Sequence, residues 1–125
     1  MDKRDILDTA KKYAEAINNK FSVAKVYLFG SYSKGCFNEH SDIDVAVVLD
    51  DYEDFFDIQV NLMYLTRKID SRIEPHPFRI EDFNNNDPLA YEVLQHGIEI
   101  KIQDKPTYVD FDQVAEKTEK YITTK

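Results

Sequence analysis

Apolar residues recur at intervals of three and four along the first segment of the chain, which is the spacing of one helical face. The positions concerned are Ile6, Leu7, Ala10, Tyr13, Ala14 and Ile17. We expect a helix over residues 3–18 that packs this face onto a core and ends at Asn18-Asn19.

Four further segments are rich in β-branched and aromatic residues or alternate between apolar and polar ones, and each is expected to form a strand. They are residues 23–30, 42–50, 71–78 and 98–102. The second is apolar on both faces beyond Asp44, which predicts a central strand covered on both sides. The third contains Pro75 and Pro77, which cannot donate to a ladder, so it must lie at an edge or end early. The last alternates cleanly and should leave one face in water.

Two more helices are expected between the strands. Residues 52–69 carry apolar side chains at helical spacing, which predicts a crossover helix. These side chains are Phe55, Phe56, Val60, Met63 and Tyr64. Further on, Asp87 is a good N-cap and Pro88 suits the first helical position, so a short helix over residues 88–96 should end at Gly97.

The order of these elements, α-β-(loop or α)-β-α-β-α-β, predicts an α/β or α+β fold with a small mixed β-sheet flanked by helices. We expect a single domain at residues 1–103. Residues 104–125 are polar with a weak helical period, which indicates a C-terminal helix or a partly disordered tail.

The chain has 125 residues, a formal net charge of −8 and a single cysteine. An acidic surface repels phosphate backbones, so we expect no direct nucleic-acid binding, although acidic clusters can hold Mg²⁺. The sequence has no apolar run near the ~20 residues that a membrane span needs, and its charged start lacks the apolar core of a signal peptide. One cysteine cannot form an internal disulfide, which suits a reducing compartment. We therefore expect a cytoplasmic protein without membrane contact.

The turn after the first predicted strand carries Gly30 and Ser31. A strand that ends there and enters a short turn or helix leaves backbone N–H groups that bind phosphate, and the Ser31 hydroxyl adds a donor. Glycine at position 30 lets a phosphate approach closely, and Gly35 permits the chain to turn back.

Two aspartates open the next predicted strand. Asp42 and Asp44 are two residues apart, so both carboxylates leave the same face, with Cα atoms roughly 6–7 Å apart. Such a pair can share one or two divalent ions, as in sites that clamp the attacking and leaving oxygens of a phosphoryl transfer. Because the Gly-Ser turn and the acids lie on neighbouring strands, the sequence predicts a site for a nucleoside triphosphate.

Other phosphate and metal motifs are not matched. A Walker loop needs Gly-Lys-Ser/Thr, but Cys36 follows Gly35, and the dinucleotide fingerprint Gly-x-Gly-x-x-Gly does not occur. An EF-hand loop needs a ligand where this chain has Ala46, and the Cys and His spacing does not suit zinc.

The motif as a whole resembles the signature of the nucleotidyltransferase superfamily related to DNA polymerase beta. It consists of Gly30-Ser31, three residues, Gly35, six residues, and Asp42-Ile43-Asp44 before an apolar run. At this length the chain is most similar to the minimal nucleotidyltransferase (MNT) group, which includes the antitoxins of HEPN/MNT toxin–antitoxin pairs. The resemblance covers residues 23–75 and extends to residue 102.

The resemblance implies roles for the site residues. In the family the Gly-Ser pair holds the triphosphate, the two aspartates bind Mg²⁺, and a third carboxylate on a later strand completes the site and helps to activate the acceptor hydroxyl. Glu74 is the matching candidate, where the family usually has aspartate. Many relatives have arginine after the Gly-Ser pair; this chain has Tyr32, which leaves Lys34 as the nearest cation.

The function implied by the resemblance is transfer of a nucleoside monophosphate, AMP from ATP, to an acceptor hydroxyl as pyrophosphate leaves. Larger relatives carry extra domains for their acceptors, so here a HEPN-type toxin partner or a second copy of the chain is expected to complete the acceptor site. Two alternatives remain open: a non-catalytic antitoxin that masks its partner, and an enzyme that modifies a small molecule such as an aminoglycoside.

The remaining polar candidates are expected to have structural roles. His76 shares a strand face with Glu74 and would be in reach of metal or nucleotide, but a surface or packing histidine is the expected outcome. Glu53, Asp54 and Asp57 are expected to form a solvated helix face.

Overall fold

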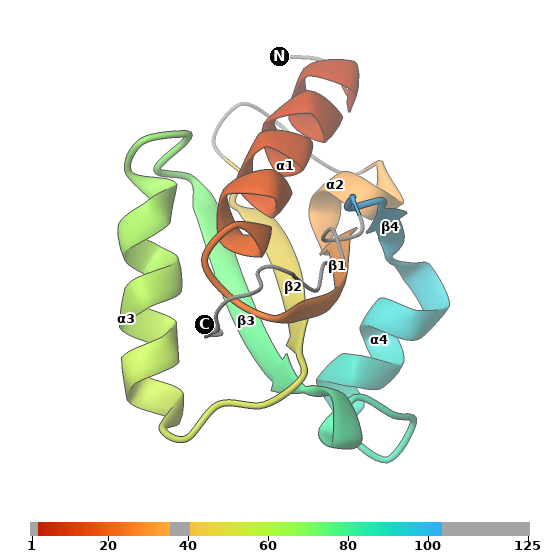
Figure 1. Ribbon diagram of the computed structural model, residues 1–125. Coiled ribbons are helices and arrows are strands. Elements are labelled where there is room, and N and C mark those ends of the chain that lie inside the picture. Colours follow the sequence, from red (N-terminus) through yellow and green to blue (C-terminus); the bar gives the residue numbers. More distant parts are fainter. Residues whose placement is uncertain (1–2, 36–40, 104–125) are drawn as a thin grey trace.

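A four-stranded mixed sheet lies at the centre of the structure, a computed structural model that describes residues 3–35 and 41–103 (Figure 1). In chain order the elements are α1 (Lys3–Asn18), β1 (Val23–Phe29), α2 (Ser31–Lys34), β2 (Ile43–Leu49), α3 (Phe55–Thr66), β3 (Ile73–Arg79), the 3-10 turn η1 (Ile80–Asp82), α4 (Pro88–His96) and β4 (Ile98–Ile100). Apart from η1, each was expected from the sequence. The tail expected at residues 104–125 lies outside the described residues.

The strands are arranged in the order β3-β2-β1-β4. β2 pairs antiparallel with β1 and parallel with β3. The second pairing is parallel because α3 carries the chain back to the end of the sheet at which β2 begins. β2 is therefore central, as its apolar faces predicted, and β3 lies at an edge, as Pro75 and Pro77 required. The predicted mixed α/β fold is confirmed.

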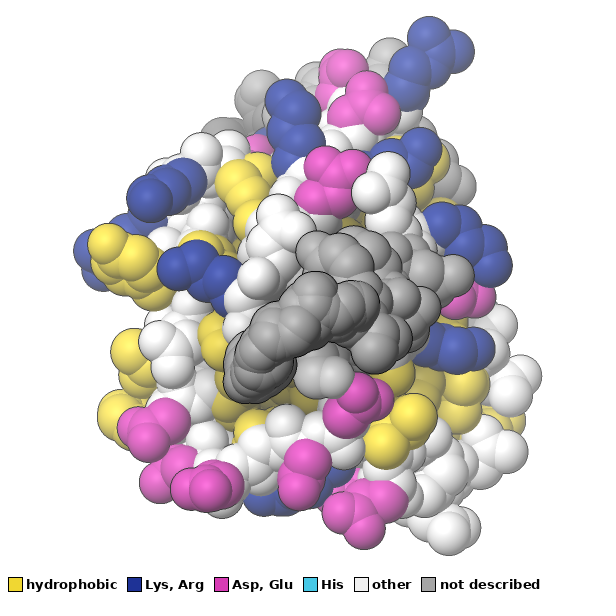
Figure 2. All heavy atoms as spheres, viewed as in Figure 1, with side chains coloured by type: hydrophobic (Ala, Val, Ile, Leu, Met, Phe, Trp, Pro, Cys, Tyr) yellow, Lys and Arg dark blue, Asp and Glu magenta, His cyan; other side chains and the backbone are white. Residues whose placement is uncertain are grey.

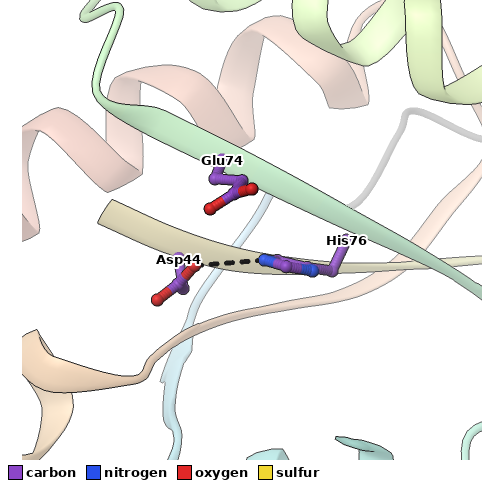
Figure 3. Close-up of side chains that lie close together, drawn as sticks. All are labelled: Asp44, Glu74 and His76. Carbon is purple, nitrogen blue, oxygen red and sulfur yellow. Dashed lines mark hydrogen bonds and ion pairs between the residues drawn. The ribbon is translucent and has the colours of Figure 1, made fainter. Parts of the chain in front are cut away.

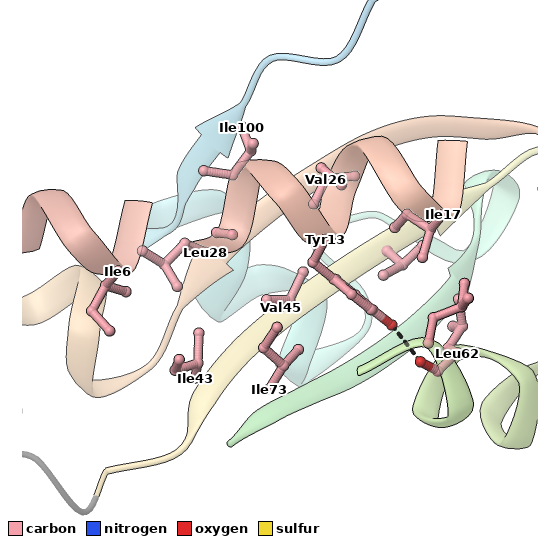
Figure 4. Packing of buried hydrophobic residues seen from close by; sticks show 14 of the residues in the cluster. Ile6, Tyr13, Ile17, Val26, Leu28, Ile43, Val45, Leu62, Ile73 and Ile100 are labelled. Carbon is pink, nitrogen blue, oxygen red and sulfur yellow. Dashed lines mark hydrogen bonds between the residues drawn. The ribbon is translucent and has the colours of Figure 1, made fainter. Parts of the chain in front are cut away.

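One face of the sheet packs against α1 and α3 (Figure 4). The buried residues on this side include Ile6, Ala10, Tyr13, Ile17, Val26, Leu28, Ile43, Val45, Leu62 and Ile73. The hydroxyl of Tyr13 donates a hydrogen bond of 2.7 Å to the carbonyl oxygen of Leu62, which joins the two helices. The apolar stripe predicted for α1 is thus core packing. In the described part of the chain, every helix is too short or too polar to cross a bilayer.

The opposite face of the sheet is covered in part by α4, which packs on β1. The buried residues here are Tyr27, Phe29, Ala46, Val48, Phe78, Ala90 and Val93. α4 begins as predicted, because the Asp87 side chain accepts hydrogen bonds from the backbone N–H groups of Leu89 and Ala90. At the start of β2 and β3, this same face carries polar side chains instead.

The apolar side chains that predicted α3 do not face the core. Phe55, Phe56, Val60, Met63 and Tyr64 are all exposed, and the buried residues of the helix are Ile58, Leu62, Leu65 and Thr66. Because two sides of α3 are apolar, the spacing identified the helix but not the side that packs. The neighbouring acids Glu53, Asp54 and Asp57 are exposed, as expected, and Asp54 also caps the helix through the N–H groups of residues 56 and 57.

Candidate active site

The turn between β1 and α2 passes close to the beginning of β2. Gly30 has a φ of +75°, and a Cβ atom added there would collide with Oδ2 of Asp44. Ser31 begins α2 and is partly buried, and Gly35 ends this helix with a φ of +78°. Glycine is needed at both positions for its positive φ, and at position 30 also for space.

Asp44 and Glu74 meet across β2 and β3. They are direct partners in the parallel register, and Phe29 faces Asp44 from the other side in β1. Because Ile43 and Val45 point into the core under α1, the carboxylate of Asp44 lies on the face that α4 covers only in part. Asp44 is half-buried there and Glu74 is exposed.

His76 completes a cluster with these two acids (Figure 3). Its Nε2 lies 3.1 Å from Oδ1 of Asp44, and its ring packs edge-on against Phe29 with the ring centroids 5.1 Å apart. One ligand atom from each of Asp44, Glu74 and His76 lies within 4.8 Å of the other two. The side chains of Asp44 and His76 are 23% and 27% exposed, so the cluster can be reached from solvent.

The donor set fits a divalent cation. Carboxylate oxygens and an imidazole nitrogen are ordinary ligands of divalent metals, and a cation between the carboxylates removes the repulsion between like charges. Asp42 precedes β2, is exposed, and is not a member of this three-residue cluster. Of the predicted metal ligands, the structure therefore brings Asp44 and Glu74 together and leaves Asp42 outside the cluster.

Sequence reasoning gave His76 a surface or packing role, and its contact with Phe29 is such a packing contact. What it missed is the approach to Asp44. The signal was available, because a residue two positions after Glu74 on a strand shares its face. The shared face alone does not bring His76 to Asp44. The parallel register does so, because it pairs His76 with Ala46, which follows Asp44 by two residues on the same face of β2.

Lys34, the cation expected nearest the triphosphate, is paired with α4. Its Nζ lies 2.7 Å from Oε2 of Glu92. This hydrogen bond holds the pKa of Glu92 below its usual value, because it stabilises the charged carboxylate. The pair joins α2 to α4, two elements that flank the site.

Tyr32 occupies the position where many relatives have arginine, and its side chain is only 1% exposed. Its hydroxyl donates to the carbonyl oxygen of Ser41 at 3.4 Å and accepts from Arg72 at 3.5 Å. Arg72 in turn donates to Asp70 at 2.8 Å, which lowers the pKa of Asp70 and raises the pKa of Arg72. Tyr32 therefore anchors α2 to the core.

A groove of about 560 Å³ runs beside the cluster along β3. It lies between the starts of α3 and α4, and its lining includes Tyr52, Phe55, Glu74, His76, Asp82 and Leu89. The guanidinium carbon of Arg79 lies 4.2 Å from the centre of the Tyr52 ring, and burial raises the pKa of Tyr52. A ligand in this groove would have one end at Glu74 and His76.

The comparison with known proteins agrees with this geometry. The family model described as "Polymerase beta, Nucleotidyltransferase" matches residues 11–106, which is most of the chain. The chain belongs to this nucleotidyltransferase family. Membership confirms the resemblance inferred from the Gly-Ser and Asp-x-Asp spacing, and it confirms the expected enzyme class.

Two relatives of this nucleotidyltransferase come from Methanocaldococcus jannaschii. "Putative protein adenylyltransferase MJ1379" is 29% identical over 72 residues, which cover 56% of this chain and 72% of the relative. "Putative protein adenylyltransferase MJ0604" is 36% identical over 56 residues, which cover 42% of this chain and 56% of the relative.

Solved structures share the fold of this nucleotidyltransferase. A crystal structure of a toxin-antitoxin with AMP-PNP matches with a TM-score of 0.57 and 26% identity over 74% of this chain and 72% of that one. A mutant of the toxin-antitoxin MntA-HpeT matches with a TM-score of 0.52 and 25% identity over 81% and 72% of the two chains. "A putative nucleotidyltransferase from Sulfolobus solfataricus" (TM-score 0.53, 23% identity, 78% and 80% coverage) supports the fold alone.

Proposed function

We propose that this nucleotidyltransferase transfers AMP from ATP to a hydroxyl group of a partner protein, as an MNT-type antitoxin. The observation that carries the proposal is the cluster of Asp44, Glu74 and His76 beside the Gly30 turn. The proposal is supported by two relatives that are named "Putative protein adenylyltransferase", and by the toxin-antitoxin neighbour with AMP-PNP.

In this proposal, Asp42, Asp44 and Glu74 hold the divalent cation, Mg²⁺, and His76 is a further ligand. When bound, the cation supplies positive charge against the phosphate oxygens. Asp42 is exposed immediately before β2, so it can turn toward a cation beside Asp44 without disturbing a buried contact.

The triphosphate is proposed to lie at the β1–α2 turn. The backbone N–H groups after Gly30 and the Ser31 hydroxyl would bind the β- and γ-phosphates. Lys34 would exchange Glu92 for a phosphate oxygen, because its 2.7 Å pair with Glu92 is partly exposed and costs little to break.

The chemical step is a displacement at the α-phosphorus. Glu74 orients the acceptor hydroxyl and takes its proton while the hydroxyl oxygen forms a bond to the α-phosphorus. The bond from this phosphorus to the oxygen shared with the β-phosphate breaks, and pyrophosphate leaves. Catalysis would then consist of positioning and charge neutralisation, with no covalent intermediate on the protein.

The acceptor is proposed to be a hydroxyl side chain of a HEPN-type toxin. The toxin-antitoxin neighbours support a protein partner, and the groove beside Glu74 has room for a side chain or a short segment. The acidic lining of the groove, with Glu74, Asp82 and Asp87, favours a second candidate as well. This is a cationic small molecule bearing hydroxyl groups, of the aminoglycoside kind.

The test is incubation with ATP labelled at the α-phosphate, Mg²⁺ and the protein encoded beside this chain. Label on the partner protein is expected, and Asp44→Asn should remove it while Asp57→Asn, an exposed acid on α3, leaves it unchanged. Neutralisation of the partner that survives Asp44→Asn would instead indicate masking. Label on an added aminoglycoside and not on protein would favour the small-molecule reaction.

A further inference from the structure

The exposed side of α3 is an apolar surface formed by Phe56, Val60, Met63 and Tyr64, here called the α3 face. These side chains are 72%, 50%, 42% and 57% exposed. Val60 follows Phe56 by four residues, and Met63 and Tyr64 follow Val60 by three and four, so the four side chains form one stripe along the helix. Contiguous apolar patches of this kind on a protein surface mark association sites.

The two ends of the α3 face carry opposite charges. Glu53 and Asp57 lie at the beginning of the helix, Arg67 and Lys68 follow its end, and all four are exposed. Figure 2 shows this polarity on the left of the molecule, where acidic side chains gather at the lower end of α3, basic ones at the upper end and hydrophobic ones between. A second copy of α3 that runs antiparallel would place unlike charges together at both ends.

The stripe also combines a projecting side chain with a hollow. Phe56 is the most exposed of the large apolar residues among those described. A shallow hollow of about 360 Å³ lies beside the second half of the helix, with Val60, Met63, Tyr64 and Arg67 in its lining. If two antiparallel copies of α3 cross near Val60 and Asn61, Phe56 of one copy lies opposite the hollow of the other. This is because Phe56 lies about as many residues before the crossing point as the hollow lies after it.

We propose that the α3 face is the interface of a homodimer in which α3 pairs antiparallel with the same helix of a second copy about a two-fold axis. Phe56 enters the hollow beside Met63 of the partner subunit, and Glu53 lies near the partner subunit's Arg67. The two-fold axis repeats each contact, which is the closed arrangement of most homo-oligomers. A parallel copy would instead oppose acid to acid and base to base.

The proposed dimer is independent of the proposed reaction. The stripe lies on the side of α3 away from Ile58 and Leu62, whereas the groove at the active site is lined by Phe55 on another side of the helix. Each copy carries a net charge of −8, so two copies repel each other. Salt screens this repulsion between exposed charges, but it weakens charge pairs that are partly buried in an interface much less. We therefore expect the dimer to be measurable at about 0.15 M salt, where the Debye length is ~8 Å.

The first test is sedimentation equilibrium of the full chain over concentrations up to about 100 μM. The wild type is expected to form a dimer, and Phe56→Asp is expected to weaken it at least about tenfold. Tyr91→Asp is the matched control, because Tyr91 is an exposed aromatic residue on α4 outside the α3 face, and it should leave the dimer intact. Circular dichroism and thermal melting check that both variants fold. A wild type that stays monomeric overturns the proposal, as does a dimer that Phe56→Asp leaves unchanged.

The second test concerns the antiparallel register. Arg67→Glu and Glu53→Lys are each expected to raise the dissociation constant severalfold, and the double variant should return it towards the wild-type value. The single variants replace exposed residues, so they should fold normally. A double variant weaker than either single one would overturn the antiparallel pairing.

Discussion

Nε2 of His76 lies 3.1 Å from Oδ1 of Asp44, across two neighbouring parallel strands. The two residues are 32 positions apart, so the contact depends on α3 carrying the chain from β2 to β3 in one register. It places an imidazole nitrogen beside carboxylates for which the sequence predicted only oxygen ligands.

Replacing His76 with alanine is expected to lower the affinity for Mn²⁺ more than the affinity for Mg²⁺. A nitrogen ligand favours first-row transition ions, whereas Mg²⁺ prefers oxygen ligands. The loss for Mn²⁺ should be about tenfold or more, measured by calorimetric titration with metal alone. His96→Ala is the control, because His96 is exposed at the end of α4. Equal losses for both ions would instead assign His76 to the orientation of Asp44.

Gly30→Ala and Gly35→Ala form a matched pair. Both positions have positive φ, so each alanine should lower the free energy of unfolding by about 1 kcal/mol, and the collision with Asp44 should add to this loss at position 30. Only the Cβ at position 30 meets Asp44, whereas nothing lies within 4 Å of one at position 35. We expect Gly30→Ala alone to abolish ATP binding, measured by calorimetry beside urea unfolding. Equal ATP affinity in the two variants would contradict this account of the turn.

Tyr13→Phe is expected to make the protein less stable at neutral pH but less sensitive to alkali. The variant loses the hydrogen bond to Leu62, worth about 1 kcal/mol. Burial raises the pKa of Tyr13 above its ordinary value of 10.0, so the unfolded chain releases this proton first. The stabilisation of the folded state by the protonated Tyr13 is therefore complete below pH 10.0 and is lost as the pH rises above this value. Urea unfolding at several pH values measures both effects. Tyr64→Phe, an exposed control, should change neither.

Asp70→Asn is expected to remove stability at neutral pH and to change little in acid. Hydrogen bonds from Arg72 lower the pKa of Asp70 below its ordinary value of 3.8. The folded state therefore keeps this carboxylate charged at a pH where the unfolded chain binds a proton. The stabilisation is present above the unfolded pKa and is lost as the pH falls through the folded one. By denaturant unfolding, we expect a loss of about 1 kcal/mol at pH 7, which becomes smaller as the pH falls below 3.8. A loss that does not change with pH would refute the assignment.

Local pattern was enough to predict most of the elements. The α1 stripe, the cap at Asp87 and the edge position of β3 follow from residues close together in the chain, because helical spacing, capping and missing ladder donors are local properties. The β1–α2 turn was predictable for the same reason, since Gly30 and Gly35 have the positive φ that the motif requires.

The packing side of α3 was not predictable in this way. Phe56 and Val60 fit a helical period as well as Ile58 and Leu62 do, and hydrophobicity alone does not say which set meets the sheet. In the structure, Ile58 and Leu62 pack in the core and Phe56 is left on the surface.

By itself, the sequence determined that this protein has a glycine-bounded turn, a pair of acids opening a central strand, and a mixed sheet between helices. The turn and the acids depend on side chains within a few residues of one another, and the sheet follows from the order of the elements along the chain. Only the tertiary structure decided that His76 joins Asp44, that Lys34 pairs with Glu92 and that Gly30 lies against Asp44. These contacts join different elements, and the register of the strands and the packing of α4 set their geometry.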